Sequence, residues 1–495
     1  MSELPLFIQT NLLVSSSTQQ PKRKSNMKLR HILSMAALLA LPVVAQETST
    51  NYFMQSSVNR HDINPALLDK PYVSMPLFMG DFNVGTTGNL GLKTFVYKMD
   101  PTWQGYGENG NNLTTFMHPM VDTNEFLGKL KDNNRISFNL KYQLFGFGFK
   151  GFGGINSVEM NLRSNTNLAL PKSLFSFMKT IGGQEEYDVS NLGIRSENYV
   201  ELGLGHSHKI NDKLTVGGKV KFLFGLAYAD VKANDVKFRM AEDKWAVTGN
   251  VEATAAVMNT KFTTSDKVDP DDPDRHRIDE LDDFKPGLGG FGLAFDLGAT
   301  YKVMDDLTVS AALTDLGFIN WKNAQHASSA GEWEFEGFGK GNHQEEIPIN
   351  NDGRDIGDQF SELGDELGDA FAVYDDGCKS TSRALAATLS LGAEYTLPVY
   401  RNLRFGFLYQ SRMAGRHSYH QGRFSANIAP VKWFEFAVSM GFTSTGVQGG
   451  MVGSLHAKHF NITLGTDRFF GKLSKQGIPL NRANSNVSLG ISFPL

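Results

Sequence analysis

The sequence predicts an all-β protein, a transmembrane antiparallel β-barrel of about 14 strands (14–16 by the segment count) with short helices in its loops. Three observations predict it: repeated alternation of apolar and polar residues, two distinct sizes of connection between the alternating segments, and an amphipathic strand at the carboxyl end. A period of two residues is typical of β-strands, whereas the apolar residues of a surface helix recur every three to four positions.

The alternation is clearest in one segment, where Val220, Phe222 and Phe224 share one parity and Lys219 and Lys221 share the other. It returns in four later segments, 291–303, 385–397, 405–409 and 434–442. One face of each segment is apolar, and the other holds mostly Gly, Ser, Thr and charged residues. Such strands fit a barrel wall with lipid outside and a polar lumen inside.

The connections between these segments are either very short or long and polar. The short ones are 211–213, 304–306, 398–402 and 430–432. The long ones are 98–134, 165–196, 261–287, 322–383 and 471–485. Counted back from the last strand, all short turns fall at one end and all long loops at the other, as in outer-membrane barrels with periplasmic turns and external loops.

The chain closes with an amphipathic strand in which Val487, Leu489, Ile491 and Phe493 alternate with small polar residues. The outer-membrane assembly machinery recognises a terminal strand with an aromatic residue near its carboxyl end. The final residue is Leu495 rather than the usual Phe. Because Phe493 still lies near the end of an amphipathic strand, we expect the barrel assembly machinery and outer-membrane lipid as partners.

The amino-terminal region predicts export. Residues 27–45 read as a cleaved signal peptide, with a basic start, a short apolar core and a small-residue cleavage site. Residues 1–26 precede a credible initiating Met and are expected to be a misplaced start. Residues 46–80 are expected to form a plug-like periplasmic segment that enters the first strand, and residues 81–495 the barrel. The expected location is the outer membrane.

Composition and motifs exclude several classes of function. The formal charge of −4 is spread along the chain, so no nucleic acid is expected as a partner. Neither a Gly-x-Ser-x-Gly nor a His-Glu-x-x-His motif is present, so we expect no enzyme and no catalytic residues. His206 and His208 share a strand face, but a structural pair is favoured over a metal site. The acidic run 269–274 lacks the pattern of a calcium loop, and Cys378 has no disulfide partner. No metal or cofactor is expected.

Two segments have helical rather than strand periodicity and predict amphipathic helices that cap the barrel, and the functional alternative is that they form a lid or gate. The candidate residues are Leu174, Phe175, Phe177 and Met178 in the first, and Phe360, Leu363, Leu367 and Phe371 in the second. Trp321, near a predicted strand end, is a candidate for the aromatic girdle that barrels place at the membrane surface.

Several motifs carry a resemblance to a known family. They are Tyr52-Phe53-Met54, Asn64-Pro65-Ala66 and the stretches 171–175, 213–222 and 314–321. In order and spacing they resemble an uncharacterised outer-membrane family widespread in Bacteroidetes, a domain of unknown function distantly similar to the FadL and PorV group. In the FadL-like group, an Asn-Pro-Ala lies in a segment that plugs the barrel from the periplasm. The resemblance thus implies that Asn64, Pro65 and Ala66 form a plug turn.

Two functions remain open at this point. The first is passive uptake of a small hydrophobic or amphiphilic molecule, which predicts an apolar pocket in the lumen and an internal plug. The second is a structural or docking barrel, similar to PorV, which holds a secreted or surface protein and predicts a closed lumen. A soluble β-sandwich is a third possibility, because alternation alone also suits sandwiches.

Overall fold

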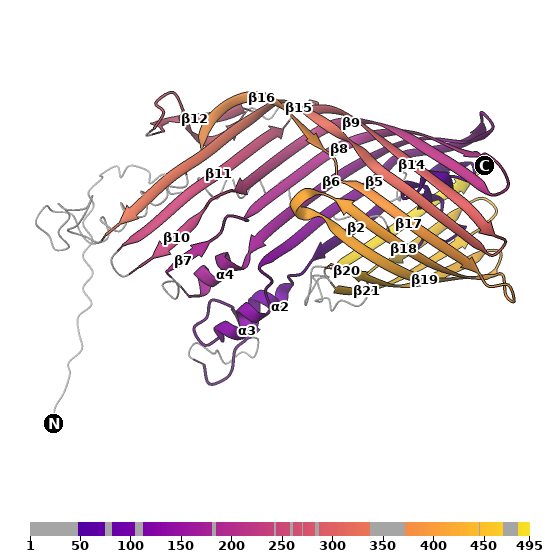
Figure 1. Ribbon diagram of the computed structural model, residues 1–495, viewed down its shortest axis with the longest axis horizontal. Helices are drawn as coiled ribbons and strands as arrows, with labels where there is room; N and C mark the ends of the chain where they lie inside the picture. Colours follow the sequence, from indigo (N-terminus) through magenta and orange to yellow (C-terminus); the bar gives the residue numbers. More distant parts are fainter. Residues whose placement is uncertain are drawn as a thin grey trace, which may run out of the picture.

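The computed structural model describes residues 48–74, 82–103, 112–180, 185–241, 244–257, 261–269, 271–282, 287–336, 372–444, 446–468 and 484–495. Within these ranges, 14 strands hydrogen-bond in a closed antiparallel ring (Figure 1). The predicted fold class is therefore confirmed. No helix in the described ranges is long and apolar enough to cross a membrane.

The ring closes between the two ends of the chain. β1 (Tyr72–Ser74) and β2 (Phe82–Gly88) form one interrupted strand, because both pair with β5 (Asn133–Gly151) and with the last strand, β23 (Ser485–Pro494). The other members follow in chain order: β6 (Gly154–Pro171), β8 (Gly193–Lys209), β9 (Leu214–Ala233), β14 (Gly290–Met304), β15 (Leu307–Phe335), β17 (Ala387–Thr396), β18 (Leu403–Met413), β19 (Tyr419–Val431), β20 (Phe434–Thr443), β21 (Gly446–His456) and β22 (Asn461–Thr466).

Burial in the barrel wall is the inverse of that in a soluble protein. Lys219 and Asp296 face the lumen and are 4% and 1% exposed, whereas the lipid-facing neighbour Leu297 is 58% exposed. Phe405 and Phe424 are likewise exposed on the outer surface. A soluble sandwich would bury the apolar parity instead. The alternation thus marks an apolar outer face and a polar interior, as predicted.

One wall of the barrel continues as an open sheet beyond the ring, and we call this part the extension sheet. β15 is 29 residues long, whereas β17 beside it has 10. β11 lies between the carboxyl-terminal parts of β9 and β15 and pairs with both. The other strands of the sheet pair at its edges (Figure 1). The added strands are β7 (Glu186–Asp188), β10 (Lys237–Met240), β11 (Trp245–Val257), β12 (Lys261–Val268), β13 (His276–Asp282) and β16 (Tyr374–Ala384).

The extension sheet corrects the predicted loops. The segments 165–196, 261–287 and 322–383 each contain strand residues, and 98–134 contains β4 (Leu113–Thr115), which pairs with β3 (Val96–Lys98), and the start of β5. The alternation fails there because strands outside hydrocarbon have water on both faces, so either parity can be polar. Residues 469–483, most of the fifth predicted loop, lie outside the described ranges.

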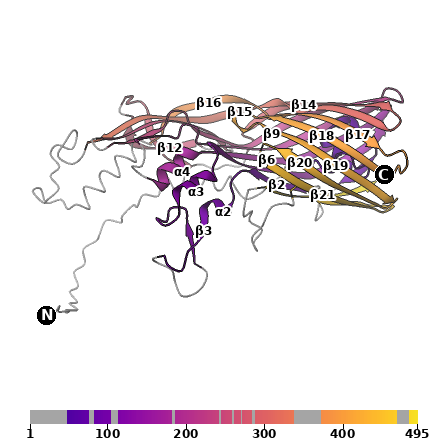
Figure 2. The same cartoon turned by 60° about the horizontal axis from the view of Figure 1, so that its bottom comes forward.

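Three short helices gather beside the extended wall. They are α2 (Leu92–Phe95), α3 (Thr123–Gly128) and α4 (Lys172–Lys179), the last being the first of the two predicted helices (Figure 2). They share an aromatic cluster in which Phe116 stacks on Phe126 at 4.4 Å and Phe175 meets both rings edge-on. Such burial of an amphipathic face stabilises helices that are too short to persist alone.

Candidate functional site

Residues 48–71 fill the lumen at the end of the barrel with the short turns, and we call them the plug. Their backbone is bonded to charged side chains that point inward from the wall. The Ser49 amide donates to Asp467 Oδ2 at 2.6 Å, and the Ser56 amide donates to Glu435 Oε2 at 2.9 Å. The plug contains two short 3-10 helices, η1 (Val58–Asp62) and η2 (Pro65–Leu67). Wall carboxylates thus satisfy backbone groups that would otherwise be buried without partners.

The predicted turn Asn64-Pro65-Ala66 lies inside this plug. Asn64 Oδ1 accepts the amide of Ala66 at 3.0 Å, and Asn64 Nδ2 donates to the carbonyl of Ala299 at 3.3 Å. Pro65 begins η2, where its fixed φ suits the first position of a helix. The three residues therefore form a capped turn that is bonded to β14.

The wall accommodates the plug through lumen-facing glycines on five strands. At Gly406 an added Cβ would overlap the ring of Phe53, and at Gly298 it would overlap the Asn64 side chain. The full set is Gly217, Gly298, Gly392, Gly406 and Gly450. Because these positions have no side chain, plug and wall approach to backbone contact, and any larger residue would displace the plug.

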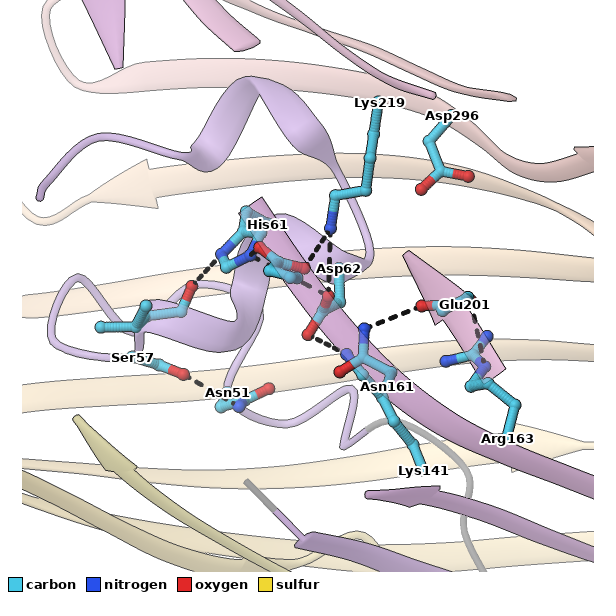
Figure 3. A network of polar contacts seen from close by, with 12 residues as sticks. Asn51, Ser57, His61, Asp62, Lys141, Asn161, Arg163, Glu201, Lys219 and Asp296 are labelled. Carbon is cyan, nitrogen blue, oxygen red and sulfur yellow. Dashed lines mark hydrogen bonds and ion pairs between the residues drawn. The ribbon is translucent and has the colours of Figure 1, made fainter. Parts of the chain in front are cut away.

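A network of buried charges joins η1 to three strands of the wall, β5, β6 and β9 (Figure 3). It consists of His61, Asp62, Lys141, Glu159 and Lys219. Glu159 accepts from His61 Nε2 at 2.6 Å and from Lys219 Nζ at 2.8 Å. Asp62 forms an ion pair with Lys141 and lies 3.4 Å from Lys219 Nζ. Each carboxylate therefore has at least two cationic partners, which offsets the cost of burying it.

The imidazole of His61 is held in its charged form. Nδ1 lies 2.5 Å from the carbonyl oxygen of Val58 and Nε2 faces the Glu159 carboxylate, so both nitrogens must donate. Although burial alone would lower the pKa of His61, the Glu159 carboxylate raises it above its ordinary value. Burial would raise the pKa of Asp62, but Lys141 and Lys219 hold it well below its usual range. At neutral pH the network therefore consists of ions.

His61, Asp62 and Glu159 are close enough to one another to resemble a metal site. Their chemistry argues otherwise. Both imidazole nitrogens carry protons, and a histidine ligand needs a free lone pair. Both carboxylates already bind the ammonium groups of Lys141 and Lys219. The cluster is an ion-pair network that anchors the plug.

Above the plug lies a cavity of about 280 Å³, which we call the lumen cavity. Its lining mixes polar and apolar groups: Arg195, Glu197, Arg383 and Arg412 are among the polar residues, and Leu385 and Met413 are the largest aliphatic ones. A cavity of about 60 Å³ shares Asn165, Arg412 and Tyr419 with it and reaches Ile63 and Lys141. A third cavity, of about 20 Å³, shares Ile63 and Lys141 with the second and lies between the plug and the wall. The cavities therefore become smaller toward the plug and continue beside it.

The other predicted site residues lie away from the lumen cavity. Phe175 is buried in the helical cluster and Phe177 stacks on Phe238 of β10 at 4.5 Å, while Leu174 and Met178 pack at the edges of these clusters. None of these four lines the cavity. Phe360, Leu363, Leu367 and Phe371 lie outside the described residues. The lid role of both segments stays a prediction.

Sequence reasoning missed the charge network and misplaced Trp321. The indole is 1% exposed, stacks on Tyr228 at 5.2 Å and covers Gly225 from within the lumen, so it is no girdle residue. A bulge in β15 between Leu313 and Leu316 reverses the parity that faces the lumen, so that Trp321 points inward. The available signal for the network was Lys219 beside Lys221 on the lumen parity of β9.

Comparison with known proteins gives a family and distant structural likenesses. The model of a family of unknown function, DUF5723, matches residues 65–467. No curated protein matches the chain. The Ralstonia pickettii toluene transporter TbuX is 11% identical, with 87% of this chain and 91% of that chain covered and a TM-score of 0.38. For a Pseudomonas aeruginosa FadL homologue the values are 10%, 90%, 92% and 0.36.

Proposed function

The chain belongs to the DUF5723 family, whose function is unknown, and we propose from its geometry that it is an outer-membrane barrel for passive uptake of a small molecule through a plugged lumen. One observation carries the proposal: the cavities inside the wall connect through shared lining residues to Ile63 and Lys141 and become small beside the plug. A purely structural barrel has no need of a solvent-sized interior space above a separate closing segment.

The membrane location is supported by the exposed apolar face of the strands. Leu297, Phe405 and Phe424 are among the large apolar side chains that water would otherwise contact. Because outer-membrane barrels place short turns in the periplasm, the plug closes the periplasmic end and the lumen cavity faces the external loops. A signal peptide at residues 27–45 would deliver the chain there.

For the solute, an amphiphilic molecule is supported better than a purely hydrophobic one. The lumen cavity is not the purely apolar pocket expected for a hydrophobic solute. Instead, guanidinium and amide groups line the lumen cavity together with Leu385 and Met413. A ligand with one polar and one apolar end satisfies both kinds of lining.

A docking role is the second candidate, and the extension sheet favours it. β12 and β13 form a hairpin at the edge of that sheet, joined to β16 through a register pair between Arg277 and Tyr374. Such edges offer backbone groups to an added strand. A stable partner recovered from intact outer membranes through this sheet would support docking, and recovery of none would count against it.

Uptake is tested by loosening the plug without removing it. Proteoliposomes holding the full chain are compared with those holding the Glu159→Gln variant, and swelling in small amphiphiles and in sugars is recorded. We expect slow swelling for the wild type and faster swelling for the variant. Trypsin cleavage after Arg60 reports separately whether the plug has moved. If the plug becomes cleavable while the liposomes stay impermeable, the uptake proposal fails.

A further inference from the structure

The lumen cavity contains two guanidinium groups that form no ion pair with a described carboxylate, although Glu197 and Asp315 lie near enough to act on them electrostatically. Arg195 pairs with Asp230 at 2.9 Å, which leaves Arg383 and Arg412. Arg383 Nε donates to the Tyr228 hydroxyl at 3.0 Å, and Arg412 Nη2 donates to Asn165 Oδ1 at 3.2 Å. Among the described residues, neither forms an ion pair.

These two side chains differ from the other lumen cations near the plug. Arg404 pairs with Glu435, Arg163 with Asp315 at 3.1 Å, and Lys221 with Asp296 at 2.8 Å. An enclosed guanidinium loses hydration, and neutral partners such as a phenol or an amide compensate only part of that loss. The pattern is typical of a site that takes its counter-charge from a ligand.

We propose that the lumen cavity binds a small solute through an oxyanion group, carboxylate or phosphate, with Arg383 and Arg412 as its recognition pair. The inference rests on the proposed uptake function and specifies the polar end of the solute. Guanidinium groups donate in pairs to the oxygens of such anions, which gives both strength and orientation. The volume of about 280 Å³ limits the ligand to the size of a small organic acid or phosphate ester.

The remaining polar lining fits the same ligand class. The side-chain amides of Asn139, Asn165 and Asn167 supply neutral donors around the two arginines. Glu197 is the one carboxylate in the lining, and it has no hydrogen bond or ion pair within the described structure. It lies in the field of Arg195, Arg383 and Arg412, so it competes with an incoming anion. The Glu197 carboxylate therefore repels a bound oxyanion, and removing its charge should strengthen the binding of that anion.

The experiment is calorimetric titration of the full chain in detergent with inorganic phosphate and, separately, with succinate. We expect saturable binding of one or both, weakened about tenfold or more by Arg383→Gln or Arg412→Gln. Glu197→Gln should tighten it several-fold, a direction that misfolding cannot produce. Arg401→Gln is the matched control, because that side chain is 65% exposed at a turn and should leave binding unchanged.

The outcomes separate the sources of the anion. Binding of phosphate alone identifies a phosphate-bearing solute, and binding of succinate alone a carboxylate. Absence of saturable binding of either anion overturns the inference. So does binding by Arg383→Gln and Arg412→Gln that is as tight as that of the wild type, or binding by Glu197→Gln that is weaker. Swelling of liposomes by the plug variant is independent of these titrations. The uptake proposal can therefore survive when the oxyanion site fails.

Discussion

The two halves of the lumen contrast in how their charges are satisfied. Around the plug, Glu159 and Asp62 each form ion pairs with cationic side chains. The plug also contacts the wall directly at Gly298 and Gly406, which have no side chains. In the lumen cavity, the guanidinium of Arg383 donates to the Tyr228 hydroxyl and forms no ion pair with a described carboxylate. Complete pairing fixes one polypeptide segment in one position, whereas incomplete pairing leaves binding capacity for another molecule. The half of the lumen around the plug thus fixes the plug in place, and the half that contains the lumen cavity is suited to bind a ligand.

Loss of the Glu159 carboxylate beside the plug should have the largest effect on stability and on plug cleavage. Glu159→Gln leaves His61 and Lys219 without their shared carboxylate, and loss of one member of a buried ion pair costs about 3–5 kcal/mol. We expect a lower unfolding temperature on heat-modifiable gels and tryptic cleavage of the plug. Glu252→Gln is the control, because Glu252 pairs with Lys232 at a 49% exposed site. Equal stability of the two variants would contradict the anchoring role.

Breaking the close approach of plug and wall should have an intermediate effect. In Gly406→Ala the new methyl group meets the ring of Phe53, and overpacking of this kind costs about 1–3 kcal/mol. Gly422→Ala is the matched control, since its nearest neighbour, the Phe407 ring, lies 3.5 Å from the added atom. Rates of tryptic cleavage after Arg60 should rise for the first variant alone. A plug equally protected in both variants would show that the glycine contacts are dispensable.

A rise in pH should weaken the binding of the plug by a smaller amount. The pKa of His61 is raised in the folded chain, so its contribution to plug binding is complete below the ordinary histidine pKa near 6.5 and is lost as pH rises through the folded value. Swelling rates should therefore increase on the alkaline side. Because a glutamine side chain does not titrate, His61→Gln should abolish this dependence. An unchanged pH profile in that variant would assign the dependence to another group.

Charges outside the lumen should have the smallest effect and so sharpen the contrast. Arg401 pairs with Asp306 at 3.0 Å across two neighbouring turns, and its side chain is 65% exposed. Exposed pairs contribute about 0–1 kcal/mol. Arg401→Gln should leave the unfolding temperature, plug cleavage and swelling within error of the wild type. A large loss would show that the turns, rather than the lumen charges, hold the barrel together.

The sequence by itself determined the barrel. Alternation at positions such as Val220 and Lys221 predicts which face meets lipid, because hydrocarbon outside and water inside impose opposite demands on successive residues. The turns after β8, β14 and β17 follow from the same pattern, and η2 from Asn64-Pro65. Local chemistry of this kind needs no knowledge of distant contacts.

Only the tertiary structure decided the interior. Glu159 lies 98 residues from His61 along the chain and Lys219 lies 60 residues from Glu159, so their meeting depends on the curvature that brings β6 and β9 around the plug. Two bulges of one residue, in β15 between Leu313 and Leu316 and in β9 between Gly225 and Ala227, placed Trp321 and Tyr228 on a shared inner face. The extension sheet was hidden because water on both faces removes the alternation. Periodicity reports the solvent on each side of a strand, and it carries no information on which lumen side chains face one another.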